Sequence, residues 1–491
     1  MTRRRQRNII TFVRTAKALR SLLPRGSRRL FAFAGIADLF INNAKKGAHT
    51  AGCPGRYATI GMKYSLAQLL EFVEESDIKF IRLAFCDSFG VQKNIAIMAS
   101  QLAHAVENGV PFDASSIDGF ANVTESDLYL VPDLGTFSLL PWRPSEGCVA
   151  RLFCNIQYPD GRPFEGDGRY LLQQAEQRAS AMGYRFLVGW KCEFYLFEND
   201  ERGRPTLQPF DDAGYFDMVP MDRGENVRRD ICLTLEEMGI QPQRSHHENG
   251  PGQNEVDFRC ASPLRSADDL MAMRTVVKAI SAQNGLFASF LPKPLRDKSG
   301  SGMHINLSLF KDEQDLFADF RTNPDPAAAS FLAGILRRMP EITIFANPLP
   351  GSYKRLGHLE APGTVGWSCQ NRSSLVRIPA VKGDACNMEL RSPDPSCNPY
   401  LVTALLLEAG FEGLEEKLPL QPAADQSVAA LPLPDSLEKA VAVARESEFL
   451  RRVLPENLLN SYLECKAQEA RNYAAERDPY RYELEKYFRC I

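Results

Sequence analysis

Four short stretches, far apart in the chain, each place a carboxylate or an imidazole in an otherwise apolar, strand-like segment. They span residues 191–193, 246–255, 303–306 and 389–391. An acidic side chain is costly to bury unless it is paired or bound to a metal ion. Four such stretches are more than structure alone explains, so together they predict a polar cavity that binds divalent cations.

The strongest metal-ligand candidates are three glutamates, Glu193, Glu248 and Glu255. Carboxylate oxygens suit Mg2+ or Mn2+, and such ions bring phosphates and carboxylates together. His304 and Glu389 lie in similar strand-like contexts and join them as candidates. A single histidine on a strand is more often a satisfied core residue than a ligand. The glycines just before His304 favour the ligand, because glycine lets a backbone approach a bound group closely.

Four arginines follow in a short part of the chain: Arg355, Arg372, Arg377 and Arg391. Guanidinium groups bind phosphate and carboxylate through paired hydrogen bonds. Any one of these arginines alone is explained more simply by a structural ion pair. Four of them in loops with glycine and proline, beside the glutamates, favour an anionic substrate and the transfer of a phosphoryl group.

The elements that position these residues fall into two groups. Ser65 is placed to cap a helix over 66–75, and residues 78–84 and 91–97 alternate as two strands around a turn at 87–90. This small α+β unit ends near turn-like residues 158–168.

Beyond that boundary, helix-like and strand-like segments alternate, which predicts a larger mixed domain. The helix-like segments are 170–182, 226–238 and 267–283, and the strand-like ones are 185–197, 254–258, 302–310, 376–379 and 387–391. Strands that are polar on one face and apolar on the other can curl into a cup whose polar face lines a cavity.

Composition and net charge limit the class of protein and the kind of partner that the chain can have. The chain has 491 residues, 44% hydrophobic and 24% charged, which indicates a globular protein of two or three domains. A net charge of -3 argues against nucleic acid or an anionic membrane as partner and favours small molecules. No apolar run approaches the ~18 residues that a membrane-spanning helix needs. The twelve cysteines show no paired metal-binding spacing, which predicts reduced thiols and a cytoplasmic location.

The first 61 residues form a separate basic leader, with thirteen lysines and arginines and one acid, Asp38. This composition is typical of a transit peptide, but also of a solvated tail or of sequence upstream of a start at Met62. We favour the last two interpretations, because targeting motifs produce many false positives. Residues 1–61 are therefore left out of the fold prediction.

From about Met62 onwards, a series of motifs resembles the glutamine synthetase family, bacterial type I class. The motifs stand at residues 112–117, 246–255, 293–294, 300–304, 347–356, 360–362, 371–373, 377–379 and 389–395. No single motif would suffice, but their order along the chain is specific to the family.

The resemblance implies an α+β fold with a small N-terminal β-grasp domain, residues 62–160, and a large catalytic domain, residues 166–491. In the catalytic domain a curved antiparallel sheet would form a half-barrel surrounded by helices. The subunits would form a homo-oligomer, a ringed dodecamer, in which each active site lies between neighbouring subunits.

The implied reaction is the ATP-dependent joining of ammonium to glutamate through γ-glutamyl phosphate. Of two metal sites, one would use Glu193, Glu248 and Glu255, and the nucleotide-side site His304 and Glu389. Substrate-binding residues would be Gly300, Arg355 and Arg391, and ATP and phosphate would contact Lys191, Ser308, Arg372 and Arg377. Catalytic residues would be Asp113, from the adjacent subunit, Glu360 and Arg372.

One departure from the family stands at Lys191, where the family usually has a glutamate that binds the nucleotide-side metal. A lysine there should weaken cation binding, through a lost ligand and through repulsion. Either its ammonium group replaces the metal on the ATP phosphates, or the chain is a catalytically weak scaffold or sensor. A third interpretation is a sequence error or a side chain that points elsewhere. Because the other motif residues are retained, we favour an active ligase, either for ammonium or for another amine. A smaller departure is Gly351, where the family often has asparagine.

Overall fold

The first described helix, α3 (Leu66–Glu75), begins at Ser65 with a capping box. The Ser65 hydroxyl accepts the N–H of Gln68, and the Gln68 side chain accepts the N–H of Ser65 at 2.9 Å. Strands β1 (Ile78–Cys86) and β2 (Gln92–Met98) follow, joined by a turn in which Asp87 accepts the N–H groups of Phe89 and Val91. The predicted helix and hairpin are confirmed.

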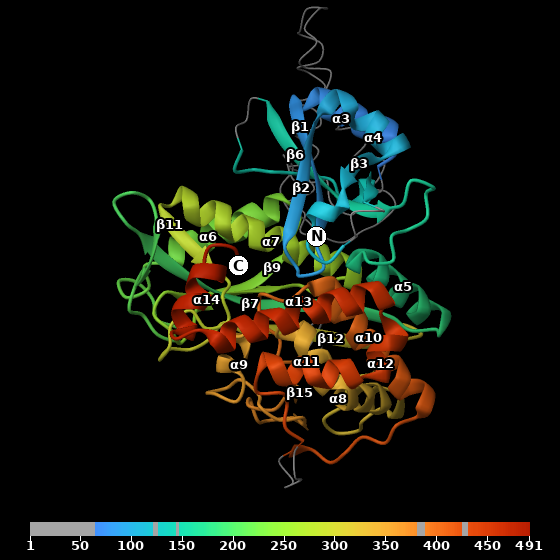
Figure 1. Cartoon of the computed structure of the whole chain (residues 1–491), viewed down its shortest axis with the longest axis vertical. Coiled ribbons are helices and arrows are strands. Elements are labelled where there is room, and N and C mark those ends of the chain that lie inside the picture. The colour runs from blue at the N-terminus through green and yellow to red at the C-terminus, as the bar shows by residue number, and fades with distance from the viewer. Residues whose placement is uncertain (1–63, 121–125, 144–146, 381–387, 425–430) are drawn as a thin grey trace, which may run out of the picture. The chain divides into compact units, whose positions relative to one another are not determined.

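The computed structural model describes residues 64–120, 126–143, 147–380, 388–424 and 431–491 (Figure 1). The basic leader predicted over residues 1–61 lies outside them.

The N-terminal sheet has six strands, in the order β2-β1-β6-β4-β3 with β5 beside β6. β1 pairs in parallel with β6 and antiparallel with β2. Helices α3 and α4 pack with the sheet around a core that includes Leu69, Ile81 and Leu130. The remaining elements are β3 (Val110–Asp113), β4 (Asp127–Pro132), β5 (Ser138–Leu139), β6 (Cys148–Gln157), α4 (Leu102–Asn108), and the 3-10 turns η2 (Ala99–Gln101), η3 (Ala114–Ser116) and η5 (Leu134–Thr136).

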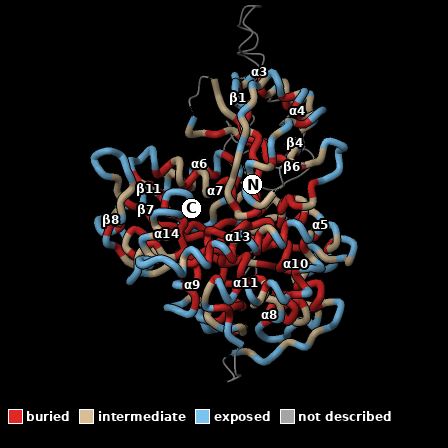
Figure 2. Tube along the Cα trace, in the orientation of Figure 1, coloured by how far each residue is buried: buried red, intermediate tan, exposed pale blue. Residues whose placement is uncertain are grey.

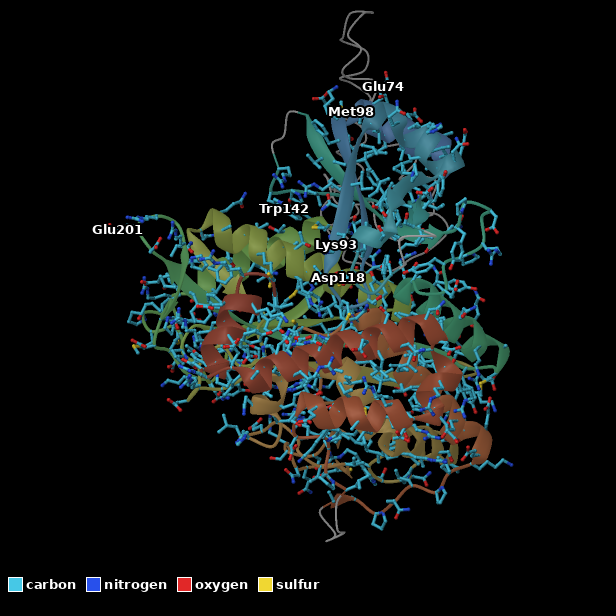
Figure 3. All side chains as sticks on the ribbon, viewed as in Figure 1. Glu74, Lys93, Met98, Asp118, Trp142 and Glu201 are labelled. Atoms are coloured by element: carbon cyan, nitrogen blue, oxygen red, sulfur yellow. The ribbon has the colours of Figure 1, made fainter. Side chains whose placement is uncertain are left out.

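The second sheet has ten strands and curls into the predicted half-barrel, in the order β14-β15-β16-β12-β7-β10-β9. β8 and β11 pair with β7, and β13 pairs with β12; among these pairs only β14 with β15 is parallel. The strands are β7 (Arg185–Asn199), β8 (Pro205–Pro209), β9 (Pro242–His247), β10 (Gln253–Phe258), β11 (Leu286–Ser289), β12 (Met303–Lys311), β13 (Gln314–Asp315), β14 (Trp367–Ser368), β15 (Val376–Arg377) and β16 (Met388–Leu390). Glu201, in the exposed turn between β7 and β8, lies at the edge of the view in Figure 3.

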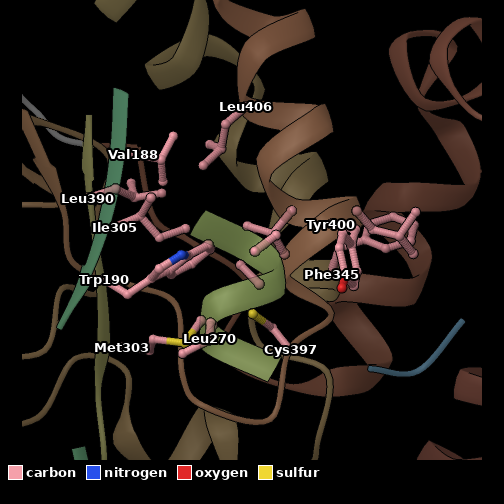
Figure 4. Close-up of a cluster of buried hydrophobic side chains, with 14 of the residues drawn as sticks. Val188, Trp190, Leu270, Met303, Ile305, Phe345, Leu390, Cys397, Tyr400 and Leu406 are labelled. Atoms are coloured by element: carbon pink, nitrogen blue, oxygen red, sulfur yellow. The ribbon is translucent and has the colours of Figure 1, made fainter. Parts of the chain in front are cut away.

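Helices cover the apolar face of this sheet. Trp190 of β7 and Ile305 of β12 pack in one cluster with Leu270 of α7 and Leu406 of α10 (Figure 4). Burying one such side chain contributes about 1.5–3 kcal/mol. Figure 2 shows buried residues gathered around α10 and α13, with exposed residues on the outer loops. The helices are α5 (Gly168–Ala181), α6 (Glu225–Glu237), α7 (Pro263–Gln283), α8 (Pro326–Ala346), α9 (Ser352–Arg355), α10 (Pro399–Glu416), α11 (Leu437–Glu446), α12 (Glu448–Val453), α13 (Glu456–Ala475) and α14 (Pro479–Tyr487).

The β1–β2 turn contacts the segment that leads into α10. The Asn398 side chain donates to the carbonyl of Asp87 at 3.0 Å. Gly90 has φ +85, and a Cβ there would lie 2.9 Å from the carbonyl oxygen of Cys397. The turn therefore requires glycine, both for its backbone conformation and for this close approach.

None of the described helices is long and apolar enough to cross a membrane. Among the described cysteines nine are free thiols, but Cys260 is disulfide-bonded. The prediction of reduced thiols is therefore wrong at Cys260, because a disulfide depends on which residues meet in space and sequence spacing does not reveal that.

The C-terminal helix α14 reaches the segment before α9. Glu483, which is 3% exposed, places its carboxylate against Gly351 and accepts the Gly351 N–H. A Cβ at residue 351 would overlap this carboxylate. The glycine at 351, where the family often has asparagine, thus leaves room for the Glu483 carboxylate. Glu483 in turn supports the start of α9, the helix that ends with Arg355.

We expect Gly351→Ala to lower the free energy of unfolding by about 1–3 kcal/mol, because the added methyl group must displace the buried carboxylate. Glu483→Ala removes that carboxylate, so Gly351→Ala made in this background should cost little. Denaturant unfolding of the four proteins measures both effects. An equal cost in both backgrounds would mean that Glu483 is not the obstacle.

A second prediction concerns pH. Burial raises the pKa of Glu483 from 4.5 to about 7. The folded chain therefore binds more protons than the unfolded chain between these values, and stability falls as pH rises through that window. Glu483→Gln should remove this fall, making the variant more stable than the parent by about 2–3 kcal/mol at pH 8 and equal to it at pH 4.

Unfolding free energies measured from pH 4 to pH 8 test this. Glu485→Gln is the matched control, because Glu485 lies on the same helix with its side chain 65% exposed. An unchanged pH slope in Glu483→Gln would contradict the assignment.

Candidate active site

Strand register brings the acidic residues together on one face of the second sheet. Glu193 of β7 lies opposite Glu255 of β10, which in turn lies opposite His246 of β9. Side chains of directly opposed residues share a face of a sheet, as do side chains two apart on one strand. The carboxylates and the imidazole therefore meet because of backbone pairing.

The same register places Lys191, two residues before Glu193. Lys191 lies opposite Asp257 of β10 on one side and opposite His304 of β12 on the other. Further across the sheet, Glu389 of β16 lies opposite Asn306 of β12 and Arg377 of β15. The Lys191 side chain therefore points into the site, which removes the interpretation that it points elsewhere.

A cavity of about 870 Å³ lies over this polar face. It is lined by twelve of the predicted site residues: Lys191, Glu193, Glu248, Glu255, Gly300, His304, Arg355, Glu360, Arg372, Arg377, Glu389 and Arg391. The structure thus brings together residues spread over two hundred positions of the sequence.

One end of the site is a carboxylate cluster formed by Glu193, Glu248, Glu255 and His246. The Glu193 carboxylate accepts the Gln253 side-chain N–H at 2.8 Å and the Gly302 N–H at 2.9 Å. His246 Nε2 lies 3.1 Å from Glu255 Oε1. Ligand atoms lie within 4.8 Å of one another in two groups that share Glu255: Glu193, Glu255 and His304, and His246, Glu248 and Glu255.

Electrostatics show what this cluster favours. Burial, and then repulsion by Glu248 and Glu255, raises the pKa of Glu193 well above its ordinary value. Burial and the charge of Glu255 raise the pKa of Glu248 to about 7. Burial also opposes ionisation of Glu255, but hydrogen bonds from His246 and Asp257 lower its pKa to about 2. Crowded carboxylates of this kind are stabilised by a divalent cation, so the cluster fits Mg2+ or Mn2+.

The other end is a cationic cluster around Glu389, formed by Lys191, Arg377, Arg391 and His304. Glu389 Oε1 lies 3.2 Å from Lys191 Nζ, 3.2 Å from His304 Nδ1 and 3.3 Å from an Arg391 nitrogen. Its Oε2 lies 2.9 Å from Arg377. Burial opposes ionisation of Glu389, but His304 and the neighbouring charges lower its pKa well below the ordinary value. Burial and the charge of Arg391 lower the pKa of His304 to about 4, so its imidazole is neutral.

Gly300 and Arg355 form part of the cavity wall. A Cβ at Gly300 would lie 2.6 Å from the carbonyl oxygen of Pro292 and 3.0 Å from the Arg355 side chain. Arg355 is 5% exposed and donates to the carbonyls of Ser392 at 2.7 Å and Arg391 at 3.0 Å. Its guanidinium group is therefore held in place at the cavity wall.

Two further predicted residues lie on loops at the cavity mouth. Glu360 belongs to the loop 358–361, which we name the flap; its side chain is 59% exposed and lies 3.5 Å from Arg391. Arg372 is exposed and lines the same cavity. Both are placed to contact a bound molecule without supporting the core.

Two predicted residues do not line this cavity. Asp113, at the end of β3, is exposed, and its carboxylate accepts the N–H and hydroxyl of Ser115. Ser308 shares a strand face with His304, but its hydroxyl donates to Asp315 at 2.9 Å, because β13 folds back over this end of β12. The prediction that Ser308 contacts ATP is therefore not supported by its position.

A second polar layer holds the carboxylate cluster. His247 Nδ1 donates to the carbonyl of Glu248 at 2.7 Å and Nε2 donates to Asp211 at 2.9 Å. Burial opposes its charge, but the bond to Asp211 raises the pKa of His247. Arg228 pairs with Asp222 and donates to Asn254 at 2.6 Å. The carboxylates of Asp211 and Asp222 are already bonded within the protein. This layer therefore fixes the backbone around Glu248 and is not a second metal site.

Sequence reasoning missed three features of the cavity. His246 was part of a motif but was not named as a ligand. Asp257 was overlooked, although its position two residues after Glu255 on a strand is a signal for the same face. Tyr215 and Phe216 stack with ring centroids 4.0 Å apart, and Phe216 packs against His246. Their loop has no periodic pattern that would have revealed them.

The comparisons with known proteins agree on one family. The model described as "Glutamine synthetase, catalytic domain" matches residues 165–487, and "Glutamine synthetase, beta-Grasp domain" matches residues 77–159. A glutamine synthetase of Clostridium saccharobutylicum is 44% identical over 440 residues, which cover 87% of this chain and 99% of the relative. One of Methanosarcina mazei is 45% identical over 438 residues, which cover 86% and 97%.

Solved structures extend the likeness to the fold. A cryoEM structure of Plasmodium falciparum glutamine synthetase superposes with a TM-score of 0.77 at 21% identity, covering 87% of this chain and all of that chain. A complex of GmaS with ADP superposes with a TM-score of 0.76 at 29% identity, covering 85% and 98%. Family models over most of the chain and close relatives over their whole length lead to one conclusion: this chain belongs to the glutamine synthetase family.

Proposed function

We propose that this chain is a glutamate–ammonia ligase. ATP would transfer its terminal phosphoryl group to the γ-carboxylate of glutamate, leaving ADP; ammonia would then attack the γ-carbonyl and release phosphate, giving glutamine. The observation that carries this proposal is that a carboxylate cluster and a cationic cluster face one cavity. The first suits a cation and an ammonium group, and the second suits phosphate and carboxylate.

The carboxylate cluster supports one Mg2+ or Mn2+ site, held by Glu193, Glu248 and Glu255. When bound, the ion would neutralise these carboxylates and polarise an oxygen of the substrate. Hydrogen bonds from Gln253 and Gly302 orient the Glu193 carboxylate. The His247 imidazole donates to the carbonyl of Glu248 and so fixes the backbone that carries that residue. The protein's own contribution is therefore a set of oxygens that are held in place before any substrate binds.

The arginines support the anionic substrates. Arg355, fixed by backbone carbonyls beside Gly300, would bind the carboxylate of glutamate together with Arg391. Arg372 and Arg377 would contact the phosphates, with Lys191 beside them, and stabilise the charge that develops during transfer. The GmaS relative with ADP supports a nucleotide in this fold.

The proton must leave ammonium before nitrogen can attack. Glu360 on the flap is the proposed base, assisted by Asp113 of a neighbouring subunit. This role for Asp113 rests on the proposed homo-oligomeric ring, a dodecamer with active sites between subunits. We also propose a cytoplasmic location.

There are two alternatives to a glutamate–ammonia ligase: a ligase for another amine, and a catalytically weak scaffold or sensor. An amine larger than ammonium would fit the same chemistry, so the assay should include a series of amines. A catalytically weak scaffold or sensor finds no support in the comparisons, in which the relatives carry the name of the active enzyme.

We predict phosphate release from ATP that depends on both glutamate and ammonium, with one glutamine formed for each phosphate. Steady-state assays in Mg2+ or Mn2+, with glutamine measured by chromatography, test this. If another amine gives the faster turnover, the chain is a different γ-glutamyl ligase. ATP turnover without any amide product would contradict the proposal.

We predict that Glu360→Gln lowers kcat by about 10²–10⁴ with little change in thermal stability, because it removes a base from an exposed loop. Glu415→Gln is the matched control: Glu415 is also half-exposed and paired with an arginine, but it lies on α10 outside the cavity. Comparable losses in both variants, or none in Glu360→Gln, would remove Glu360 from the proposed chemistry.

A further inference from the structure

Glu389 is the centre of the cationic cluster, and its hydrogen-bonding capacity is used within the protein. Its Oε1 is bonded to Lys191, His304 and Arg391, and its Oε2 to Arg377. A carboxylate offers about four acceptor positions. Four donors surround it, three on Oε1 and one on Oε2, and the side chain is 1% exposed. A metal ion would have to compete with these four donors for the carboxylate.

The charge balance at the same place opposes a divalent cation. Lys191, Arg377 and Arg391 carry three positive charges around one carboxylate. Mg2+ and Mn2+ favour anionic oxygen ligands. The surplus here is positive, whereas in the carboxylate cluster it is negative. The residues of the expected nucleotide-side site therefore do not fit the metal.

Lys191 is placed where it can act on a bound ligand. Backbone register sets Lys191 between Asp257 and His304. Its Nζ lies 3.2 Å from Glu389 Oε1, and this bond holds the ammonium group in place. Its side chain remains 22% exposed and lines the cavity. An ammonium group held in this way presents a fixed point charge, as lysines do in other phosphate-binding sites.

We propose that the Lys191 ammonium, with Arg377, binds the nucleotide phosphates in place of a divalent cation, so that each chain holds one such ion in the carboxylate cluster instead of two. The inference rests on the proposed function for the identity of the ligand. The number of metal sites does not depend on activity.

The test is the number of Mn2+ ions bound per chain in the absence of nucleotide, by equilibrium dialysis with the free ion measured by electron paramagnetic resonance. We expect one ion for the wild-type protein. Lys191→Glu adds a carboxylate and removes the repelling charge, so it should bind two. Lys191→Gln removes the charge without adding a carboxylate and should still bind one.

Glu193→Gln identifies the site that is counted: it should weaken the single wild-type site at least tenfold. Two ions of comparable affinity in the wild-type protein would overturn the proposal, and so would a second site that appears equally in Lys191→Gln and Lys191→Glu. Should Lys191→Glu fail to fold, the wild-type count and the Lys191→Gln count still decide between these outcomes.

A second measurement addresses the phosphates. Calorimetric titration with ADP in the presence of EDTA should show binding by the wild-type protein, weakened at least tenfold in Lys191→Gln. Equal ADP affinity in both proteins would contradict the role of the ammonium. A protein with one Mn2+ site and no ligase activity would sink the proposed function alone, whereas an active protein with two sites would sink this inference alone.

Discussion

The site depends on the pairing of β7 with β10 on one side and with β12 on the other. This pairing sets Glu193 beside Glu255 and Lys191 beside both Asp257 and His304. A shift of one residue in either pairing would turn the site residues of the shifted strand into the apolar core. The packing of Trp190 and Ile305 against α7 and α10 prevents such a shift, because it would expose large buried side chains to the cavity. The core thus stabilises the register, and the register builds the site.

The polar face separates charge into two regions. Buried charges are costly unless they are compensated, and the two clusters are compensated differently. In the cationic cluster, Glu389 is neutralised by side chains of the protein itself. In the carboxylate cluster, burial and repulsion keep Glu193 and Glu248 from ionising easily. A bound cation relieves the second cluster, and a bound anion relieves the positive surplus of the first. The two regions suit the anionic and the cationic substrates of the proposed reaction.

Local patterns predicted the elements that position the site, and family motifs predicted most of its residues. The Ser65 cap, the β1–β2 hairpin and the strands β7, β10 and β12 followed from local patterns. Helix α10 escaped prediction, because most of its residues are buried and little amphipathic period remains. Ser308, which the resemblance assigns to ATP, donates its hydroxyl to Asp315, a contact that the motifs do not reveal. The bonds around Glu389 could not be predicted, because they depend on register between strands far apart in sequence, whereas the place of Asp257 two residues after Glu255 was a signal in the sequence.

The most direct test is a crystal structure of the chain with Mn2+ and ADP, with the manganese located by its anomalous scattering. The account predicts a manganese peak bounded by Glu193, Glu248 and Glu255, and phosphate oxygens of ADP against Lys191 Nζ and Arg377. A manganese peak coordinated by Glu389, with Lys191 turned away from the phosphates, would contradict it.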